Sequence, residues 1–295
     1  MLIVFDIGGT AIKYGVISSF EKPLFLYQEE VESNAKVIKG MGIINKIKKI
    51  IKENLQQYAI EGIAISTAGM VDANQGKIIY ANENIPEYTG ICIKAILEKE
   101  FNIPCWVEND VNAAALGETI YGAGKKSDYT FMVTVGTGVG GAIVLHHEVY
   151  HGFSNSAGEI GYMLLNDQYF EKSASTSALI QSVETIKKEN GIDGKKIFYM
   201  AKQGDEICIK MIDILCEQLV KGISNCICLL NPQIVILGGG IMSQKDYLRE
   251  IINRYMKKYL NSEMQKNTKI EFAELGNQAG MIGAYVYWLK KERKI

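Results

Sequence analysis

Two glycine-rich turns of the same kind constrain this chain more than any other feature. Gly8-Gly9-Thr10 follows the apolar run from Leu2 to Phe5, and Gly136 to Gly141 follows the apolar run from Phe131 to Val135. Apolar, β-rich residues also leave each turn, so both segments are predicted to be β-hairpins. Glycine at such a turn lets backbone N–H groups approach phosphate oxygens and makes positive φ accessible. The repetition indicates duplicated domains that face one nucleotide.

Composition indicates a globular protein with a small-molecule partner. The 295 residues are 47% apolar, and 32 Lys and Arg nearly balance 33 Asp and Glu. This length suits two domains, and balanced charge gives no general attraction to nucleic acid or to an anionic membrane. The start of the chain lacks a basic region, and no apolar run approaches the roughly 20 residues that span a bilayer. We therefore expect a cytoplasmic protein that binds neither nucleic acid nor membrane.

Strand and helix patterns alternate along the chain in two similar series, which predicts an α/β class with mixed sheets flanked by helices and a cleft between two domains. The predicted domains cover residues 1–118 and 119–275, and a C-terminal helix within 276–295 is expected to pack near the first domain. The main expected elements are three strands in residues 1–32, a helix at Lys36 to Leu55, strands at Gly62 to Thr67 and Cys105 to Glu108, a helix at Val111 to Tyr121, strands within Tyr129 to Tyr150, a long helix at Ile207 to Leu230, strands at Ile234 to Leu237 and Lys269 to Ala273, and a final helix at Gly276 to Lys290.

Asp6 places a carboxylate directly before the first glycine turn. A carboxylate beside phosphate requires a cation between them, and Mg²⁺ uses one or two carboxylates with water and phosphate oxygens. The segment therefore indicates a magnesium nucleotide, although an ordinary Asp-Gly hairpin turn explains it equally well when taken alone. Gly238-Gly239-Gly240 follows a strand, where bare backbone suits adenine or ribose; the full dinucleotide fingerprint is missing, so a Rossmann site is rejected.

Three further carboxylates are candidates for chemistry on a hydroxylated substrate. Asp110 lies where a strand meets a helix, and it could accept a proton from a hydroxyl that attacks a phosphate; plain helix capping by Asn109 and Asp110 is the alternative. Glu159 and Glu171 could accept hydrogen bonds from sugar hydroxyls, and solvated loop glutamates are the alternative. His147 and His151 are four residues apart but fall in a strand pattern, which disfavours a metal pair on a helix face.

With these motifs in place, the chain resembles the ROK family (repressors, uncharacterised frames and sugar kinases) over nearly its whole length. The family has the actin and hexokinase type of fold, so the resemblance implies two domains that are ribonuclease H-like. The motifs that carry it are Asp6 to Thr10 for DxGGT, Ile65 to Asp72 for a strand with a PG turn, Asn84 to Pro86 for NLP, Glu108 to Ala114 for ENDxNAA, Gly136 to Gly141 for GTGxGG, Gly158 to Gly161 for GExG, and Gly238 to Gly240 for GGG.

The resemblance implies a sugar kinase that uses ATP and Mg²⁺ and phosphorylates a hexose-type sugar at its C6 hydroxyl. Asp110 would be the base, and Asp6 would hold Mg²⁺ through water. The sugar would be held by Gly69, Asn84, Asn109, Asp110, Glu159 and Glu171. The nucleotide would be held by Asp6, Gly8, Gly9, Thr10, Lys13, Gly136, Thr137, Gly138, Gly238, Gly239 and Gly240. The family's habit also implies a homodimer.

Two departures from the family pattern bear on metal and substrate. The family's histidine after GExG is Tyr162 here, and its CxCGxxGC stretch is replaced by Leu165 to Phe170, before the retained Glu171. In many members of the family, that histidine and the three cysteines of the stretch supply the ligands of a structural zinc. Because all four are absent here, we expect no zinc. The local sequence is similar to those of β-glucoside kinases and bacterial N-acetylmannosamine kinases, so either substrate is expected. A glucokinase-like kinase and a sugar-sensing regulator without catalysis are the alternatives, and Asp110 argues against a sensor that has no catalytic role. A sugar-responsive repressor is disfavoured, because it would need a DNA-binding extension, whereas the first strand begins at Leu2 and the charge is balanced.

Overall fold

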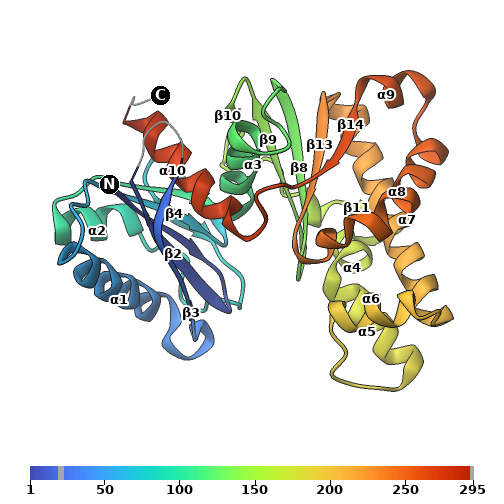
Figure 1. Cartoon of the computed structure of the whole chain (residues 1–295), viewed down its shortest axis with the longest axis horizontal. Coiled ribbons are helices and arrows are strands. Elements are labelled where there is room, and N and C mark those ends of the chain that lie inside the picture. The colour runs from blue at the N-terminus through green and yellow to red at the C-terminus, as the bar shows by residue number, and fades with distance from the viewer. Residues whose placement is uncertain (19–22, 293–295) are drawn as a thin grey trace. The chain divides into compact units, whose positions relative to one another are not determined.

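The computed structural model describes residues 1–18 and 23–292 of the chain, which divide into two compact units (Figure 1). The first unit comprises Met1–Gly122, Glu148–Ala157 and Asn277–Ile295, and the second comprises Ala123–His147 and Gly158–Gly276. The sequence placed the boundary at residues 118 and 119 and did not anticipate that residues 148–157 group with the first unit. Residues 293–295 of the predicted C-terminal segment lie outside the described residues.

The first unit is built on a sheet with the strand order β3-β2-β1-β4-β7. Strands β1, β2 and β3 pair antiparallel, whereas β1, β4 and β7 pair parallel, so the sheet is mixed. The elements of this unit are β1 (Leu2–Ile7), β2 (Ala11–Ile17), β3 (Phe25–Glu32), α1 (Ala35–Leu55), β4 (Gly62–Thr67), β5 (Met70–Asp72), β6 (Lys77–Tyr80), α2 (Ile93–Phe101), β7 (Cys105–Asn109), α3 (Asp110–Tyr121), β10 (Glu148–Val149) and, after a 3-10 turn η3 (Gly276–Gln278), α10 (Ala279–Lys291).

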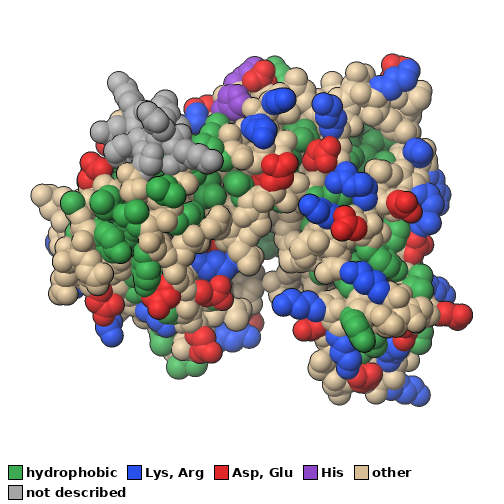
Figure 2. All heavy atoms as spheres, in the orientation of Figure 1, with side chains coloured by type: hydrophobic (Ala, Val, Ile, Leu, Met, Phe, Trp, Pro, Cys, Tyr) green, Lys and Arg blue, Asp and Glu red, His purple; other side chains and the backbone are tan. Residues whose placement is uncertain are grey.

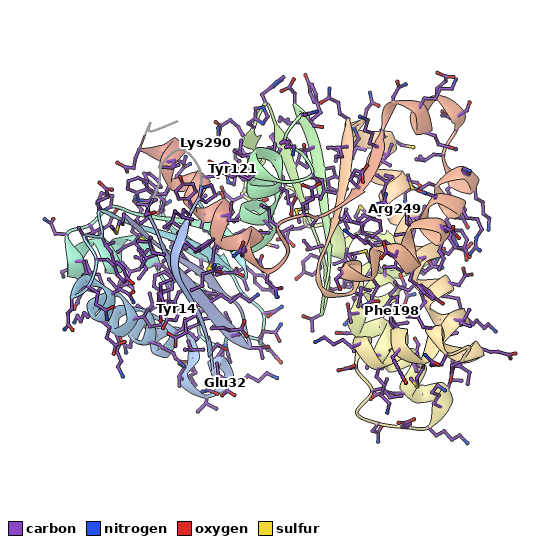
Figure 3. The ribbon with its side chains drawn as sticks, in the orientation of Figure 1. Tyr14, Glu32, Tyr121, Phe198, Arg249 and Lys290 are labelled. Atoms are coloured by element: carbon purple, nitrogen blue, oxygen red, sulfur yellow. The ribbon has the colours of Figure 1, made fainter. Side chains whose placement is uncertain are left out.

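Alternation along the strands sends two different sets of side chains to the two faces of this sheet. Ile3 and Phe5 of β1 pack against the buried isoleucines of α1, and the adjoining Tyr14 on β2 is labelled in Figure 3. The opposite face is covered by α10, which also packs along α3 (Figure 1). A Cβ on Gly283 of α10 would lie only 1.6 Å from the carbonyl oxygen of Ala113, so glycine permits this close helix contact.

The second unit repeats the strand order of the first. Its strands follow the order β9-β8-β13-β14, with β8 and β9 antiparallel and β8, β13 and β14 parallel, which corresponds to β2-β1-β4-β7. The elements of this unit are β8 (Tyr129–Val135), β9 (Val139–Leu145), η1 (Ile160–Tyr162), β11 (Leu164–Leu165), β12 (Gln168–Tyr169), α4 (Glu171–Ala174), α5 (Thr176–Lys187), α6 (Gly194–Lys202), α7 (Glu206–Leu230), β13 (Ile234–Gly238), η2 (Gly240–Gln244), α8 (Lys245–Tyr259), α9 (Ser262–Asn267) and β14 (Lys269–Phe272).

The core of the second unit joins its sheet to the helices. Phe131, Val133 and Val235 from the strands pack with Leu219 and Ile223 of α7, and all of these side chains are buried. The predicted α/β class with two mixed sheets and flanking helices is therefore confirmed. One boundary differs, because the final helix begins at Ala279 after the 3-10 turn η3 rather than at Gly276.

The surface shows mixed charge. On the face drawn in Figure 2, Lys and Arg side chains alternate with Asp and Glu side chains over both units. None of the helices in residues 1–18 and 23–292 combines the length and apolar character needed to cross a bilayer.

Candidate active site

A lateral row of polar side chains crosses the sheet of the first unit beside the first glycine turn. Asp6 on β1 pairs in register with Lys13 on β2 and with Ser66 on β4. Ser66 in turn pairs with Glu108 on β7, so each of four neighbouring strands contributes one residue to the row. Ser66 Oγ donates a hydrogen bond of 2.8 Å to Asp6 Oδ1. Burial raises the pKa of the Asp6 carboxyl, against the opposing effects of the Ser66 hydrogen bond and the Lys13 charge. A cation beside Asp6 would offset that cost of burial.

The N-terminal turn of α10 lies directly against this row. A Cβ on Gly280 would be 2.7 Å from Asp6 Oδ1 and 2.9 Å from Ser66 Oγ. Because real Cβ atoms do not approach oxygen so closely, only glycine lets the helix start reach the carboxylate. The positive end of the helix dipole is therefore near Asp6. The sequence did not single out Gly280, since its role depends on a contact between segments far apart in the chain.

The first glycine turn is braced from two sides. Within the hairpin, the Gly8 N–H donates to the Ala11 carbonyl at 2.9 Å. Ser33 Oγ donates to the Gly9 carbonyl at 2.6 Å, and the Ser33 N–H donates to the Thr10 carbonyl at 2.8 Å. A Cβ on Gly9 would be 3.0 Å from the Cβ of Asn84. The structure thus brings a predicted phosphate-binding residue and a predicted sugar-binding residue together.

Asp110 follows the last residue of β7 and begins α3. The cap is Asn109, whose Oδ1 accepts from the N–H groups of Val111 and Asn112 at 2.9 and 3.0 Å. Asn109 Nδ2 donates to Asp110 Oδ1 at 2.9 Å and to the Gly69 carbonyl at 2.8 Å. Asn109 is therefore the cap, although the Val111 N–H also donates to Asp110 Oδ1 at 2.9 Å. The same asparagine links the predicted base to the predicted wall of the sugar site.

A buried ion pair lies next to the point where β7 ends and α3 begins. Glu108 is fully buried, and its Oε2 is 2.7 Å from His151 Nε2. Its other oxygen accepts from the Asn109 N–H at 2.8 Å and from Asn112 Nδ2 at 3.2 Å. Burial acts to lower the pKa of His151, but the hydrogen bond and charge of Glu108 outweigh it, and the pKa is raised. Sequence reasoning missed this pair, because it considered His151 only together with His147, which lies 3.6 Å from Asp128.

The second glycine turn borders a pocket of about 590 Å³ in the second unit. Gly136 and Thr137 contribute one side of its lining, and Gly240 contributes another. The lining also includes Thr176, Ser177 and Ile180 of α5, Asp193 to Lys195 at the start of α6, Phe198, Ile241, Ser243 and Gln244. The volume and the mixture of apolar, hydroxyl and backbone groups suit a nucleoside. Phe198 is labelled in Figure 3, among the helices of this unit.

The pocket contains a buried polar group without a partner in the described part of the chain. Thr176 Oγ1 is buried and makes no hydrogen bond there, whereas the Thr176 N–H donates to the Gly136 carbonyl at 2.8 Å. Buried hydroxyls are nearly always satisfied, so this oxygen favours a ligand in the pocket. Sequence reasoning missed Thr176 and the start of α6, because neither segment carries a glycine cluster.

The three glycines that follow β13 have different surroundings. Gly240 lines the pocket. A Cβ on Gly239, whose φ is 96°, would lie 2.3 Å from the Val135 carbonyl oxygen, and a Cβ on Gly238 would lie 2.7 Å from Met132 Cε. Gly238 and Gly239 therefore permit close packing against β8.

Glu159 and Glu171 lie close together in the second unit. Burial and the nearby charge of Glu171 both raise the pKa of Glu159. A Cβ on Gly138 would be 2.5 Å from Glu171 Oε2, so the bare backbone of the second glycine turn makes room for this carboxylate. Glu171 therefore adjoins the predicted phosphate turn.

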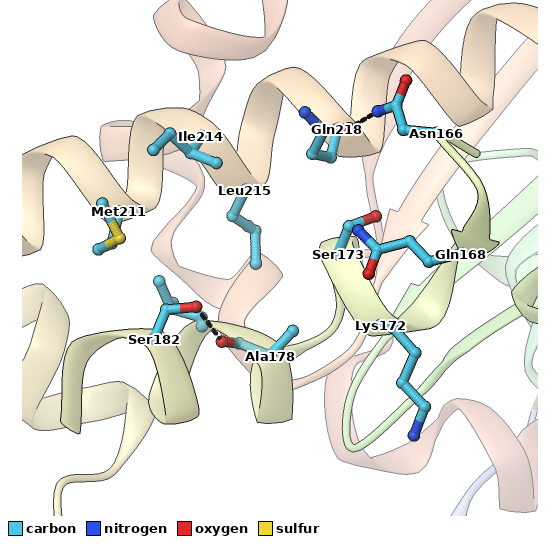
Figure 4. Close-up of a pocket in the computed structure, with 11 residues that line it drawn as sticks. Asn166, Gln168, Lys172, Ser173, Ala178, Ser182, Met211, Ile214, Leu215 and Gln218 are labelled. Atoms are coloured by element: carbon cyan, nitrogen blue, oxygen red, sulfur yellow. Dashed lines mark hydrogen bonds between the residues drawn. The ribbon is translucent and has the colours of Figure 1, made fainter. Parts of the chain in front are cut away.

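A second pocket of about 360 Å³ opens between the β11–β12 hairpin, α5 and α7 (Figure 4). Asn166 Nδ2 donates to Gln218 Oε1 at 2.9 Å across it, and Ser182 Oγ donates to the Ala178 carbonyl at 2.8 Å. Lys172 and Ser173 also line it, directly after Glu171. None of the sequence-predicted site residues lines this pocket. Within residues 1–18 and 23–292, no group of three or more His, Cys, Asp and Glu side chains is arranged to hold a metal ion.

Comparison with known proteins gives a match over nearly the whole chain. The sequence pattern of the ROK family matches residues 2–291. A beta-glucoside kinase of Listeria monocytogenes is 30% identical over 303 residues, which cover 99% of both chains.

Solved structures are also similar to this chain over nearly its whole length. A candidate N-acetylmannosamine kinase from Listeria monocytogenes has a TM-score of 0.87 and 28% identity, with 99% of both chains covered. A ROK family glucokinase from Streptomyces griseus, solved with glucose and AMPPNP, has a TM-score of 0.83 and 26% identity, with 96% of this chain and 97% of that chain covered.

Proposed function

The chain belongs to the ROK family, and from this premise we propose that it is an ATP- and Mg²⁺-dependent kinase that phosphorylates a sugar at its C6 hydroxyl. The observation that carries the proposal is the arrangement of Asn109 and Asp110. Asn109 Oδ1 accepts from two N–H groups of the first turn of α3, and Asn109 Nδ2 and the Val111 N–H both donate to Asp110 Oδ1, so the Asp110 carboxylate is held by two hydrogen bonds while the cap is supplied mainly by Asn109. A sensor without catalysis has no need for a carboxylate held in this way.

Asp110 accepts the proton of the attacking hydroxyl in the proposed reaction. The hydroxyl oxygen forms a bond to the γ-phosphorus of ATP, the bond from that phosphorus to the bridging oxygen breaks, and ADP leaves. Asn84, Asn109, Glu159 and Glu171 hold the remaining hydroxyls, and Gly69 forms a wall of the sugar site. Carboxylates and amides suit a polyol, because each accepts or donates more than one hydrogen bond and leaves unpaired groups when a hydroxyl is absent.

The two glycine turns hold the phosphates in this proposal. Gly8, Gly9, Thr10 and Lys13 contribute from the first unit, and Gly136, Thr137 and Gly138 from the second. The base and ribose occupy the pocket of about 590 Å³ beside Gly240. The match to a glucokinase solved with AMPPNP supports ATP as the phosphoryl donor.

The surroundings of Asp6 fit Mg²⁺. Its buried carboxylate has a raised pKa and lies two residues before the turn that would hold phosphate, and oxygen is the ligand that Mg²⁺ prefers. When bound, Mg²⁺ would neutralise charge on the phosphate oxygens. Asp6 would hold its coordinated water, Ser66 would orient the carboxylate, and Lys13 would add positive charge on the same face of the sheet.

The relatives support two substrates, a β-glucoside and N-acetylmannosamine, with glucose as the alternative. The test is release of ADP from purified protein with ATP, Mg²⁺ and, separately, cellobiose, N-acetylmannosamine, glucose, N-acetylglucosamine, allose and fructose. We expect turnover with at least one of these sugars and almost none with Asp110→Asn. Sugar binding without ADP release would replace the kinase proposal with a sugar-sensing regulator.

A further inference from the structure

Two exposed tyrosines form a corner on the second unit. Tyr162 of η1 and Tyr169 of β12 have ring centroids 5.8 Å apart and ring planes at 86°. Their exposed fractions are 43% and 48%. We call this pair the tyrosine corner. It lies where the family pattern places a histidine and a cysteine-rich stretch, and its role is not assigned by the proposed function.

The tyrosine corner borders the carboxylates proposed to hold the sugar. Tyr162 follows Glu159 by three residues, and Tyr169 precedes Glu171 by two. Glu171 Oε2 is 3.5 Å from the position of a Cβ on Gly161, the residue directly before Tyr162. The backbone that carries Tyr162 therefore lies beside Glu171, one of the two carboxylates proposed to hold the sugar.

The hairpin that carries Tyr169 is anchored to the core. β11 and β12 pair with Leu164 opposite Tyr169, and the Phe170 N–H donates to the Met163 carbonyl at 2.7 Å. Phe170 is fully buried, and a Cβ on Gly222 of α7 would be 2.3 Å from its ring. The ring of Phe170 thus packs directly on the backbone of α7. It anchors the two residues next to it in the chain, Tyr169 and Glu171.

We propose that the tyrosine corner is a subsite for a second ring of the acceptor, so that the substrate is a glycoside rather than a free monosaccharide. This inference rests on the proposed function. The C–H faces of a pyranose are apolar, and a tyrosine offers a large, rigid surface with a polar tip at low entropic cost. Glu159 and Glu171 would hold the phosphorylated ring, while the group attached to it lies against Tyr162 and Tyr169.

The test compares cellobiose with glucose in the wild type and in Tyr162→Ala and Tyr169→Ala. We expect the wild type to favour cellobiose in kcat/KM, and each alanine variant to lose about 3- to 10-fold for cellobiose, the range of one aromatic contact. Values for glucose should stay within about 2-fold, because glucose does not reach the corner. Tyr162→Phe should retain the preference. Tyr199→Ala, which removes a tyrosine with 66% exposure on α6, is the matched control.

Several outcomes would overturn the inference and leave the kinase intact. These are equal kcat/KM for glucose and cellobiose in the wild type, turnover of N-acetylmannosamine alone, or equal losses for both sugars in the alanine variants. A change of oligomeric state in Tyr162→Ala with an unchanged sugar preference would instead assign the corner to contact between copies of the chain. Calorimetric binding of the two sugars separates the proposals: if no ADP forms but cellobiose binds more tightly and Tyr162→Ala removes the difference, the subsite stands and the kinase does not.

Discussion

The two units have the same strand order, but their glycine turns have different surroundings. In the first unit, the turn follows a row in which Ser66 bonds Asp6, and Ser33 braces the turn from the side. In the second unit, the turn borders a pocket of about 590 Å³ and a carboxylate, Glu171, held beside Gly138. The first unit fixes charged groups, whereas the second provides space for a ligand. One topology can therefore serve two roles, because side chains on the sheet face and at the turns differ.

The largest expected effect comes from the first unit, where removal of the charge on Asp110 should lower the rate of turnover. Asp110→Asn should lower kcat by about 10²- to 10⁴-fold, because the attacking hydroxyl loses its proton acceptor. Sugar affinity, measured by calorimetry, should change little. Asp246→Asn, in the first turn of α8, is the control and should leave kcat unchanged. Normal turnover in Asp110→Asn would remove this carboxylate from the mechanism.

A second prediction concerns the glycines beside the pocket of the second unit. Gly239→Ala should destabilise the protein by about 1 to 3 kcal/mol, because φ is 96° and the new Cβ would meet the Val135 carbonyl at 2.3 Å. The shift of β13 against β8 should also weaken ATP binding by about tenfold. Urea unfolding and nucleotide titration measure the two effects.

Gly240→Ala is the matched variant. A Cβ on Gly240 has nothing within 4 Å, so stability should be close to that of the wild type. Equal stability of the two variants would show that the close packing at Gly239 is not required.

A third prediction concerns Asp6 in the first unit. One variant crowds its carboxylate and the other removes the charge. Gly280→Ala should displace Asp6, since its Cβ would lie 2.7 Å from Asp6 Oδ1. The Mg²⁺ concentration that gives half-maximal rate should rise by about tenfold, equivalent to about 1.4 kcal/mol, while sugar affinity stays constant. Asp6→Asn should shift the Mg²⁺ dependence in the same direction. An unchanged Mg²⁺ dependence in both variants would exclude Asp6 from holding the metal.

The sequence predicted elements and turns better than it predicted contacts between distant segments. Gly62 to Thr67 was predicted as a buried strand and is β4, because a continuous apolar run between turn residues is a local signal. Gly280 could not be predicted as a contact of Asp6, because that contact depends on how α10 returns to β1. The same holds for Glu108 and His151, which are 43 positions apart in the sequence.

Site prediction had a similar limit. Asp110 and Asn109 were predicted together, with helix capping by both as the alternative to a catalytic role for Asp110. The hydrogen bonds show that Asn109 accepts from two N–H groups of the helix and Asp110 from one of the same two. The pocket walls formed by Thr176 and Phe198 were missed, because hydroxyl and aromatic residues on helices have no distinctive pattern. Glycines that a turn requires can be recognised in a sequence. Residues that line a pocket can be identified only once the packing of the helices is known.

The smallest expected effect is on stability and concerns the ion pair of His151 and Glu108, the residue that precedes Asn109 and Asp110. The pKa of His151 is raised in the folded protein, so its contribution to stability is complete below the unfolded pKa of about 6.5 and is lost as pH rises through the folded pKa. His151→Asn should therefore lower the free energy of unfolding by about 1 to 2 kcal/mol at low pH and by less at high pH. His147→Asn is the control, because its ring is more exposed and lies 3.6 Å from Asp128. Chemical unfolding across this pH range measures the difference, and a deficit that grows with pH would contradict a protonated His151 paired with Glu108.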